Sequence, residues 1–167
     1  MLSKPFTFIF ALVVIALILL FGIMAITRLF SFGCAVEAEK FVMDFDNKVE
    51  VMDTLAKGSR AQYSLIVPPG VAGICFIDTT STNNIDTSKL IYPDVKQKVE
   101  LLIGDGMAMK ENMFIAADAN ADKDCLFDRK RINGLRVADN IQCFDTKFGE
   151  FKFVLENMGK YVQISGA

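Results

Sequence analysis

The hydrophobic pattern divides the chain into a continuously apolar segment, a segment of helical periodicity and a region of strand-like alternation. Residues 5–27 contain no charged side chain and lie between Lys4 and Arg28. An α-helix rises about 1.5 Å per residue, so about 20 apolar residues cross the hydrocarbon core of a bilayer, whereas the apolar part of a secretory signal has only about 7–15. The pattern therefore predicts one transmembrane helix, and we assign residues 1–33 to a membrane anchor.

The segment 36–57 has the periodicity of an amphipathic helix. Its apolar residues recur at spacings of three and four, with acidic and basic residues between them. These apolar residues are Ala38, Phe41, Val42, Phe45, Val49, Met52, Leu55 and Ala56. Gly58 directly after Lys57 is a helix stop signal. Because only residues 31–33 interrupt the pattern, we expect one long helix with a bend near Gly33, whose part 34–58 packs on the domain that follows.

After Gly58 the sequence alternates with the period of β-strands. Short runs rich in β-branched and aromatic residues occupy 62–68, 73–78, 99–103, 113–117, 135–137, 141–144, 148–155 and 161–164. Turn-forming residues separate these runs, and the polar segment 79–89 is the longest predicted loop. Strands of this length and spacing are typical of a small antiparallel β-sandwich. The predicted fold class is therefore α+β: a transmembrane helix, an amphipathic helix and a β-sandwich domain over 59–167.

Size and charge limit the function of this domain. About 135 residues follow the anchor, which fits one domain. The chain has 18 Lys and Arg against 20 Asp and Glu, a formal charge of −2, and the basic residues are interspersed with acidic ones. The sequence shows no basic patch, so we expect no nucleic-acid partner.

Four cysteines bear on the compartment of the domain. Cys34, Cys75, Cys125 and Cys143 all follow the anchor, and the absence of histidine excludes a Cys/His zinc site. Disulfides in an oxidising compartment are the interpretation we favour, with buried free thiols in a cytosolic domain as the alternative. The charges flanking the anchor do not decide its orientation. We therefore expect a cytoplasmic N-terminus and an extracytoplasmic C-terminal domain.

Three disulfide pairings are open to four cysteines, and the sequence does not choose among them. A short loop favours Cys125 with Cys143. Cys34 with Cys75 would then connect the base of the helix to the sheet. Each bridge would stabilise the fold by about 2–4 kcal/mol.

The chemistry-bearing residues do not indicate an enzyme. Without histidine, Ser/His and Cys/His nucleophiles and His-ligated metals are excluded, and the carboxylates show no distinctive spacing. The sequence Gly104-Asp105-Gly106 lacks the remaining glycines and the Gly-Lys of nucleotide-binding motifs. We expect a non-catalytic protein with no cofactor other than a possible calcium ion.

One oxygen-rich cluster resembles the first half of a calcium-binding loop. Its members, at alternate positions, are Asp118, Asn120, Asp122 and Asp124. Lys123 stands where an EF-hand loop has glycine, and Arg129 stands at the twelfth position, where the EF-hand has a bidentate glutamate. An exposed acidic turn is the interpretation we favour, and a calcium site is the alternative.

The residues Lys-Pro-Phe-Thr-Phe-Ile at positions 4–9, followed by the apolar run, resemble the prepilin signature of type IV pilins and secretion pseudopilins. The resemblance covers about six residues and the general layout. It implies that the apolar half-helix anchors the subunit and packs in a filament core, while its continuation packs on a β-rich head. It also places a processing junction between Pro5 and Phe6. Pro5 stands where the family has a small residue, usually glycine, and Phe10 where many members have an acidic one.

Two functions are compatible with this pattern. The first is a structural subunit of a membrane-anchored surface assembly, a pilin-like filament or envelope complex, in which Phe6, Phe10 and Gly22 belong to the assembly helix. Its partners would be the membrane and copies of itself or other subunits. The second is an anchored extracytoplasmic binding or adhesion module, possibly calcium-stabilised, whose contact surfaces are the loop 79–89 and the acidic turn 118–124. An assembly helix is sensitive to substitution on its packing face, whereas a plain anchor is not.

Overall fold

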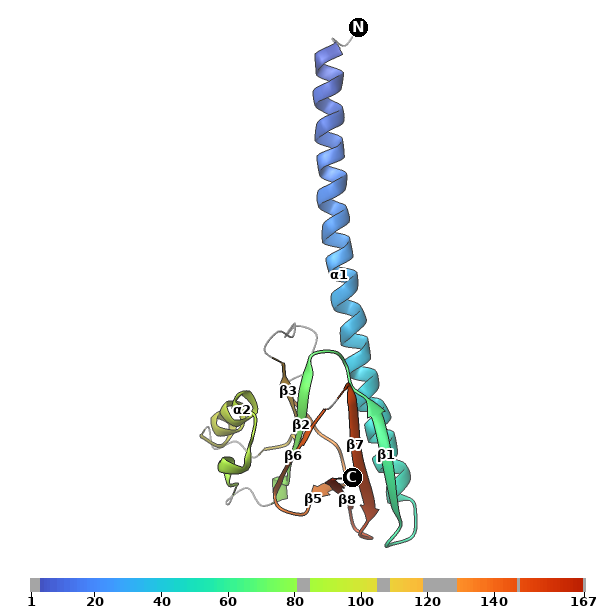
Figure 1. The fold of residues 1–167 in the computed structure, drawn as a ribbon, viewed down its shortest axis with the longest axis vertical. Helices are drawn as coiled ribbons and strands as arrows, with labels where there is room; N and C mark the ends of the chain where they lie inside the picture. The colour runs from blue at the N-terminus through green and yellow to red at the C-terminus, as the bar shows by residue number, and fades with distance from the viewer. Residues whose placement is uncertain (1–3, 81–84, 105–108, 119–128, 147, 167) are drawn as a thin grey trace. The chain divides into compact units, whose positions relative to one another are not determined.

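A computed structural model describes residues 4–80, 85–104, 109–118, 129–146 and 148–166, without the side chains of residues 4–7, 27–32 and 34. The chain forms two compact units, Met1–Gly33 and Cys34–Ala167. The described elements are two α-helices, a short 3-10 helix and strands in two mainly antiparallel sheets (Figure 1). The α+β class predicted from the sequence is therefore confirmed.

Helix α1 spans Lys4–Asp53 and has 50 residues. It continues through residues 31–33, which interrupt the hydrophobic pattern, and it ends four residues before the predicted Lys57. In the first unit, the segment Phe8–Ile26 has 19 residues and is long and apolar enough to cross a membrane, and none of it is buried. One N-terminal helix of the described chain therefore has the dimensions of a transmembrane span.

In the second unit, the end of α1 buries one face. The buried side chains recur at helical spacing and are Ala38, Phe41, Val42, Phe45, Val49 and Met52. The polar residues between them lie at the surface or are partly exposed. Phe45 is fully buried, with its ring 5.3 Å from that of Phe76 and 5.1 Å from that of Phe153, measured between centroids.

The first sheet has the strand order β1-β7-β8-β5. Its strands are β1 (Arg60–Ile66), β7 (Glu150–Asn157), β8 (Val162–Gly166) and β5 (Leu135–Val137). The pairs β1–β7 and β7–β8 are antiparallel, whereas β5 and β8 are parallel. The last strand of the chain therefore lies inside this sheet, between two earlier strands.

The second sheet has the strand order β4-β3-β2-β6, and all its pairs are antiparallel. Its strands are β4 (Arg129–Lys130), β3 (Met113–Ala117), β2 (Val71–Ile77) and β6 (Ile141–Asp145). The alternation along β2 sends Ile74 and Phe76 into a core shared with α1 and the first sheet. Cys75 and Ile77 point to the opposite face, into a second core.

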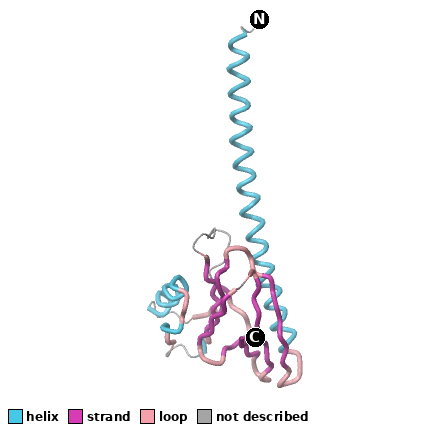
Figure 2. The backbone as a smooth tube through the Cα atoms, viewed as in Figure 1, coloured by secondary structure: helices cyan, strands magenta, loops and turns pink. Residues whose placement is uncertain are grey.

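Helix α2 (Pro93–Gly104) covers that opposite face of the second sheet, following the short helix η2 (Thr87–Lys89) (Figures 1 and 2). The predicted strand 99–103 is wrong, because these residues belong to α2. Pro93 and Asp94 begin this helix, and Val95 and Val99 are its buried residues, one turn apart. Every other predicted strand overlaps an observed one, and only the two-residue β4 was not predicted.

Candidate functional site

The largest exposed apolar surface that the structure describes belongs to α1 in the first unit. From Phe8 to Ile26 the helix has large hydrophobic side chains on all sides, and most of them are more than half exposed. Exposed apolar surface costs about 25 cal/mol per Å² in water, so a continuous surface of this kind indicates a lipid or protein environment. This surface is the first candidate site.

The structure describes the surroundings of two of the three predicted assembly residues, Phe10 and Gly22. The Phe10 side chain is 62% exposed. Apart from the adjacent residues and the nearby backbone of α1 itself, no atom would lie within 4 Å of a Cβ atom added at Gly22, so another helix could approach the backbone there. The side chain of Phe6 lies outside the described part of the structure.

Helical geometry does not bring these residues onto one face. At about 100° per residue, Phe10 and Gly22 lie about 120° apart around the axis, whereas Ala11 and Gly22 differ by only about 20°. The two small residues therefore define a common face of α1, and Phe10 lies outside that face.

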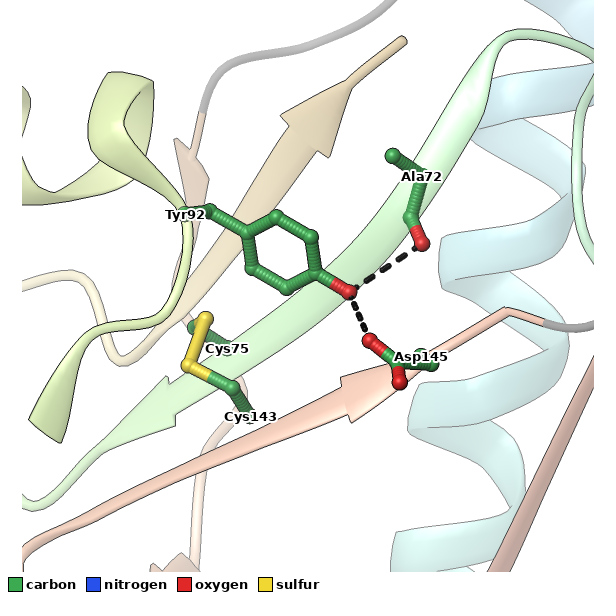
Figure 3. Close-up of a disulfide and its surroundings, with 5 residues drawn as sticks. All are labelled: Ala72, Cys75, Tyr92, Cys143 and Asp145. Carbon is green, nitrogen blue, oxygen red and sulfur yellow. Dashed lines mark hydrogen bonds between the residues drawn. A yellow bond between two sulfur atoms is a disulfide. The ribbon is translucent and has the colours of Figure 1, made fainter.

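A disulfide joins Cys75 to Cys143 across the neighbouring strands β2 and β6 (Figure 3). These cysteines are direct partners in the strand register, with their Cα atoms 4.0 Å apart. The predicted pairings of Cys34 with Cys75 and of Cys125 with Cys143 are therefore wrong, because strand pairing and not loop length brings the sulfurs together. Cys125 and the side chain of Cys34 lie outside the described part. A disulfide of this kind indicates an oxidising compartment.

Tyr92, just before α2, lies beside this disulfide on the face of the second sheet (Figure 3). Its hydroxyl donates to the carboxylate of Asp145 and lies 3.2 Å from the carbonyl oxygen of Ala72. A Cβ atom at Gly73 would lie 2.0 Å from the Tyr92 hydroxyl oxygen, so only glycine leaves room for the ring.

Burial, followed by the Asp145 carboxylate, raises the pKa of Tyr92 far above its usual value of 10.0. The hydroxyl is therefore a protonated hydrogen-bond donor that holds the start of α2 on the sheet, and it does not act as a base. This contact has no local signal in the sequence, because Tyr92 and Asp145 are 53 residues apart and neither belongs to a recognisable motif.

The predicted calcium residues are only partly within the described structure. The backbone N–H of Asp118 donates to the carbonyl oxygen of Gly70 at 2.8 Å, whereas Asn120, Asp122 and Asp124 lie outside the described residues. Across the described ranges, no group of three or more acidic, cysteine or histidine side chains could hold a metal ion. The calcium site thus stays a prediction.

The predicted contact loop 79–89 is described except for residues 81–84. At its end the Asp86 carboxylate accepts hydrogen bonds from the Ser88 backbone N–H at 3.1 Å and hydroxyl at 2.6 Å. These hydrogen bonds lower the pKa of Asp86 and cap the short helix η2.

No family model, curated protein or solved structure matches this chain. Its function is therefore argued from its own geometry.

Proposed function

We propose that this chain is a non-catalytic structural subunit of a membrane-anchored assembly, with α1 serving both as the anchor and as the assembly helix. The observation that carries the proposal is the change along α1. Phe8–Ile26 exposes apolar side chains all round, and the same helix later buries one face in the core of the second unit. A subunit that must hold a folded domain on a membrane-embedded helix needs both properties.

We infer that the second unit is a β head packed on an amphipathic helix. Phe41 and Phe45 of α1 contact Phe151 of the first sheet, and Phe45 also contacts Phe76 of the second sheet. One core cluster thus includes residues of α1 and of both sheets. This supports a sandwich-like domain with the helix packed on it, the layout that the resemblance to type IV pilins implies.

The disulfide supports an extracytoplasmic head. Cys75 is fully buried, so its bridge to Cys143 is a structural bond of the folded unit. In our proposal the N-terminus of α1 is cytoplasmic and the second unit lies on the opposite side of the membrane.

For assembly, we propose the face of α1 that contains Ala11 and Gly22. Small side chains let helix backbones approach closely in a bilayer, where van der Waals packing drives association. Apart from the adjacent residues and the nearby backbone of α1 itself, no atom lies within 4 Å of a Cβ built at Gly22, so this position is open to another helix.

The test is cross-linking of the full chain in its native membrane, followed by measurement of oligomer size. Gly22→Leu should abolish the cross-linked oligomer, because a larger side chain separates the helices. Val13→Leu is the matched control, since Val13 lies about 180° from Gly22 around the helix. Equal assembly of both variants would refute the proposed face. A wild-type chain that is only monomeric would refute the structural-subunit function itself.

An anchored binding module is the second candidate, and one observation favours it. A small polar pocket in the second unit is lined by basic side chains of Arg131, Arg136 and Lys160, among others. A binding function for this pocket is compatible with assembly through α1.

A further inference from the structure

Four basic residues line one pocket of the second unit. The pocket has a volume of about 210 Å³, and its basic residues are Lys110, Arg131, Arg136 and Lys160. They come from separate segments: just before β3, between β4 and β5, in β5, and in the turn between β7 and β8. The fold thus gathers charges that the sequence intersperses with acidic residues.

The charge of this pocket is not balanced by the protein that the structure describes. None of the four basic residues forms an ion pair with a described acidic side chain. Asp78 is the one carboxylate among the described residues of the lining, and it accepts hydrogen bonds from the backbone N–H of Thr80 at 2.9 Å and from the Thr80 hydroxyl at 2.6 Å. Four positive charges on one pocket make its potential positive, which favours the binding of an anion.

A buried asparagine fixes the loop that carries Arg131. Asn112 is 7% exposed, and its side-chain nitrogen donates to the carbonyl oxygens of Ile132 at 2.8 Å and Leu135 at 3.3 Å. Its side-chain oxygen accepts from the Ile132 backbone N–H at 2.7 Å. The Val162 backbone N–H donates to the carbonyl oxygen of Gly134 at 2.8 Å, which joins this loop to the β7–β8 turn. The framework of the pocket is therefore formed before any ligand binds.

The two guanidinium groups are also oriented by their neighbours. Arg131 Nε donates to Asn133 Oδ1 at 3.2 Å, and the Arg136 guanidinium lies 4.8 Å from the centre of the Tyr161 ring. These contacts leave most of the N–H donors of each guanidinium available. A planar guanidinium with free donors matches two oxygens of one oxyanion.

We propose that this basic pocket binds a small ligand that carries an oxyanion, namely a carboxylate, sulfate or phosphate group. Thr79 and Thr80 line the same pocket and add to its polar character. A volume of about 210 Å³ is below the usual range of about 300–1,000 Å³ for drug-sized ligands, so the ligand is compact. A nucleic-acid strand needs an extended basic track with stacking platforms, which a single small pocket does not offer.

Calorimetric titration of the full chain in uncharged detergent micelles tests this site. The probes are sodium glucuronate, sodium phosphate and, as the neutral analogue, glucose. We expect at least one of the two anions to bind and glucose not to bind. Binding should weaken when NaCl is raised from about 50 to 500 mM, because screening reduces the attraction between exposed charges. Binding of glucuronate alone identifies an acidic sugar as the ligand class, and binding of phosphate alone identifies a phosphate group.

The double variant Arg131→Gln with Arg136→Gln should weaken anion binding at least about tenfold, since two charged hydrogen-bond donors are lost. The matched control is Lys96→Gln with Lys152→Gln, which removes the same charge from exposed positions outside this pocket and should change binding less than about twofold.

A second double variant, Lys110→Gln with Lys160→Gln, keeps Arg136 on the Tyr161 ring and should also weaken anion binding. The proposed site is refuted if both pocket variants bind the anion as tightly as the wild type does. It is also refuted if the Lys96/Lys152 control variant weakens anion binding as much as the pocket variants do. It is also wrong if neither anion binds, or if a short DNA oligonucleotide binds and neither anion does. None of these variants touches α1, so cross-linked assembly should persist in all of them, which separates this test from that of the proposed function.

Discussion

Asn157, the last residue of β7, satisfies the carboxyl end of α1. It is 2% exposed, and its side-chain nitrogen donates to the carbonyl oxygens of Met52 at 2.9 Å, Asp53 at 3.0 Å and Leu55 at 2.9 Å. Its side-chain oxygen accepts from the Gly159 backbone N–H at 2.6 Å. The last carbonyl groups of a helix lack donors within the helix. The Met52 oxygen also accepts from the Leu55 backbone N–H at 3.2 Å, whereas Asn157 supplies the donor for the carbonyl oxygens of Asp53 and Leu55.

We predict that Asn157→Ala lowers the free energy of unfolding by roughly 3 kcal/mol. The two N–H groups of the side chain are shared among the three carbonyl oxygens, so with the bond to its oxygen about three hydrogen bonds are lost, each worth about 1 kcal/mol net. Asn157→Asp should lower the free energy of unfolding further than Asn157→Ala does, although aspartate has nearly the same shape as asparagine. Its carboxylate would face carbonyl oxygens at the negative end of the helix dipole, and an uncompensated buried charge costs about 3–5 kcal/mol.

Urea unfolding of the full chain in detergent, followed by circular dichroism, gives these differences. The control is Gln62→Glu, which adds the same charge at an exposed position of β1 and should change stability by less than about 0.5 kcal/mol. The Asn157→Asp deficit should also shrink at low pH, because the raised pKa of the buried carboxyl lets it become a neutral donor. If Asn157→Asp is as stable as Asn157→Ala at neutral pH, our account of this helix end is refuted.

Three further predictions concern the two cores. Phe45→Ala should lower the free energy of unfolding by about 4 kcal/mol in the same assay. Met43→Ala, at a position 68% exposed on the same helix, should lower it by less than about 0.5 kcal/mol. Similar values for the two variants would contradict the packing of α1. Replacing Cys75 and Cys143 by serine should lower stability by about 4 kcal/mol, because the bridge closes a separation of 68 residues, and non-reducing peptide mapping of the wild type should recover these two cysteines in one linked pair. The difference in free energy of unfolding between wild type and Tyr92→Phe should be constant below pH 10.0 and shrink at higher pH, because the folded-state pKa of Tyr92 is raised. If this difference does not change as the pH rises above 10.0, the hydrogen bond of Tyr92 is contradicted.

The sequence is sufficient to predict a secondary-structure element where its local periodicity agrees with the burial of its side chains. The strand 113–117 was predicted with its observed bounds because it is apolar and flanked by polar residues. The strand prediction at 99–103 is wrong because Pro93 and Asp94 begin a helix that includes this apolar run. The two-residue β4 consists of one arginine and one lysine and has no local signal at all.

The site geometry was less predictable, because it depends on contacts between distant segments. The disulfide follows from the register of β2 with β6, which loop length does not reveal. The basic pocket requires that Lys110 and Lys160, 50 positions apart in the sequence, line the same pocket. In contrast, the apolar segment of α1 needs no tertiary information, since length and composition alone identify it.

The bond between Cys75 and Cys143 also has a mechanical meaning. It closes a covalent loop that contains β3, β4, β5 and α2, so a pulling force applied at the two ends of the chain bypasses those elements. At about 3.4 Å per residue, the 68-residue separation withholds on the order of 230 Å of chain from extension. A domain held on a membrane and loaded by flow or by attached neighbours would therefore lengthen far less under tension than its number of residues allows.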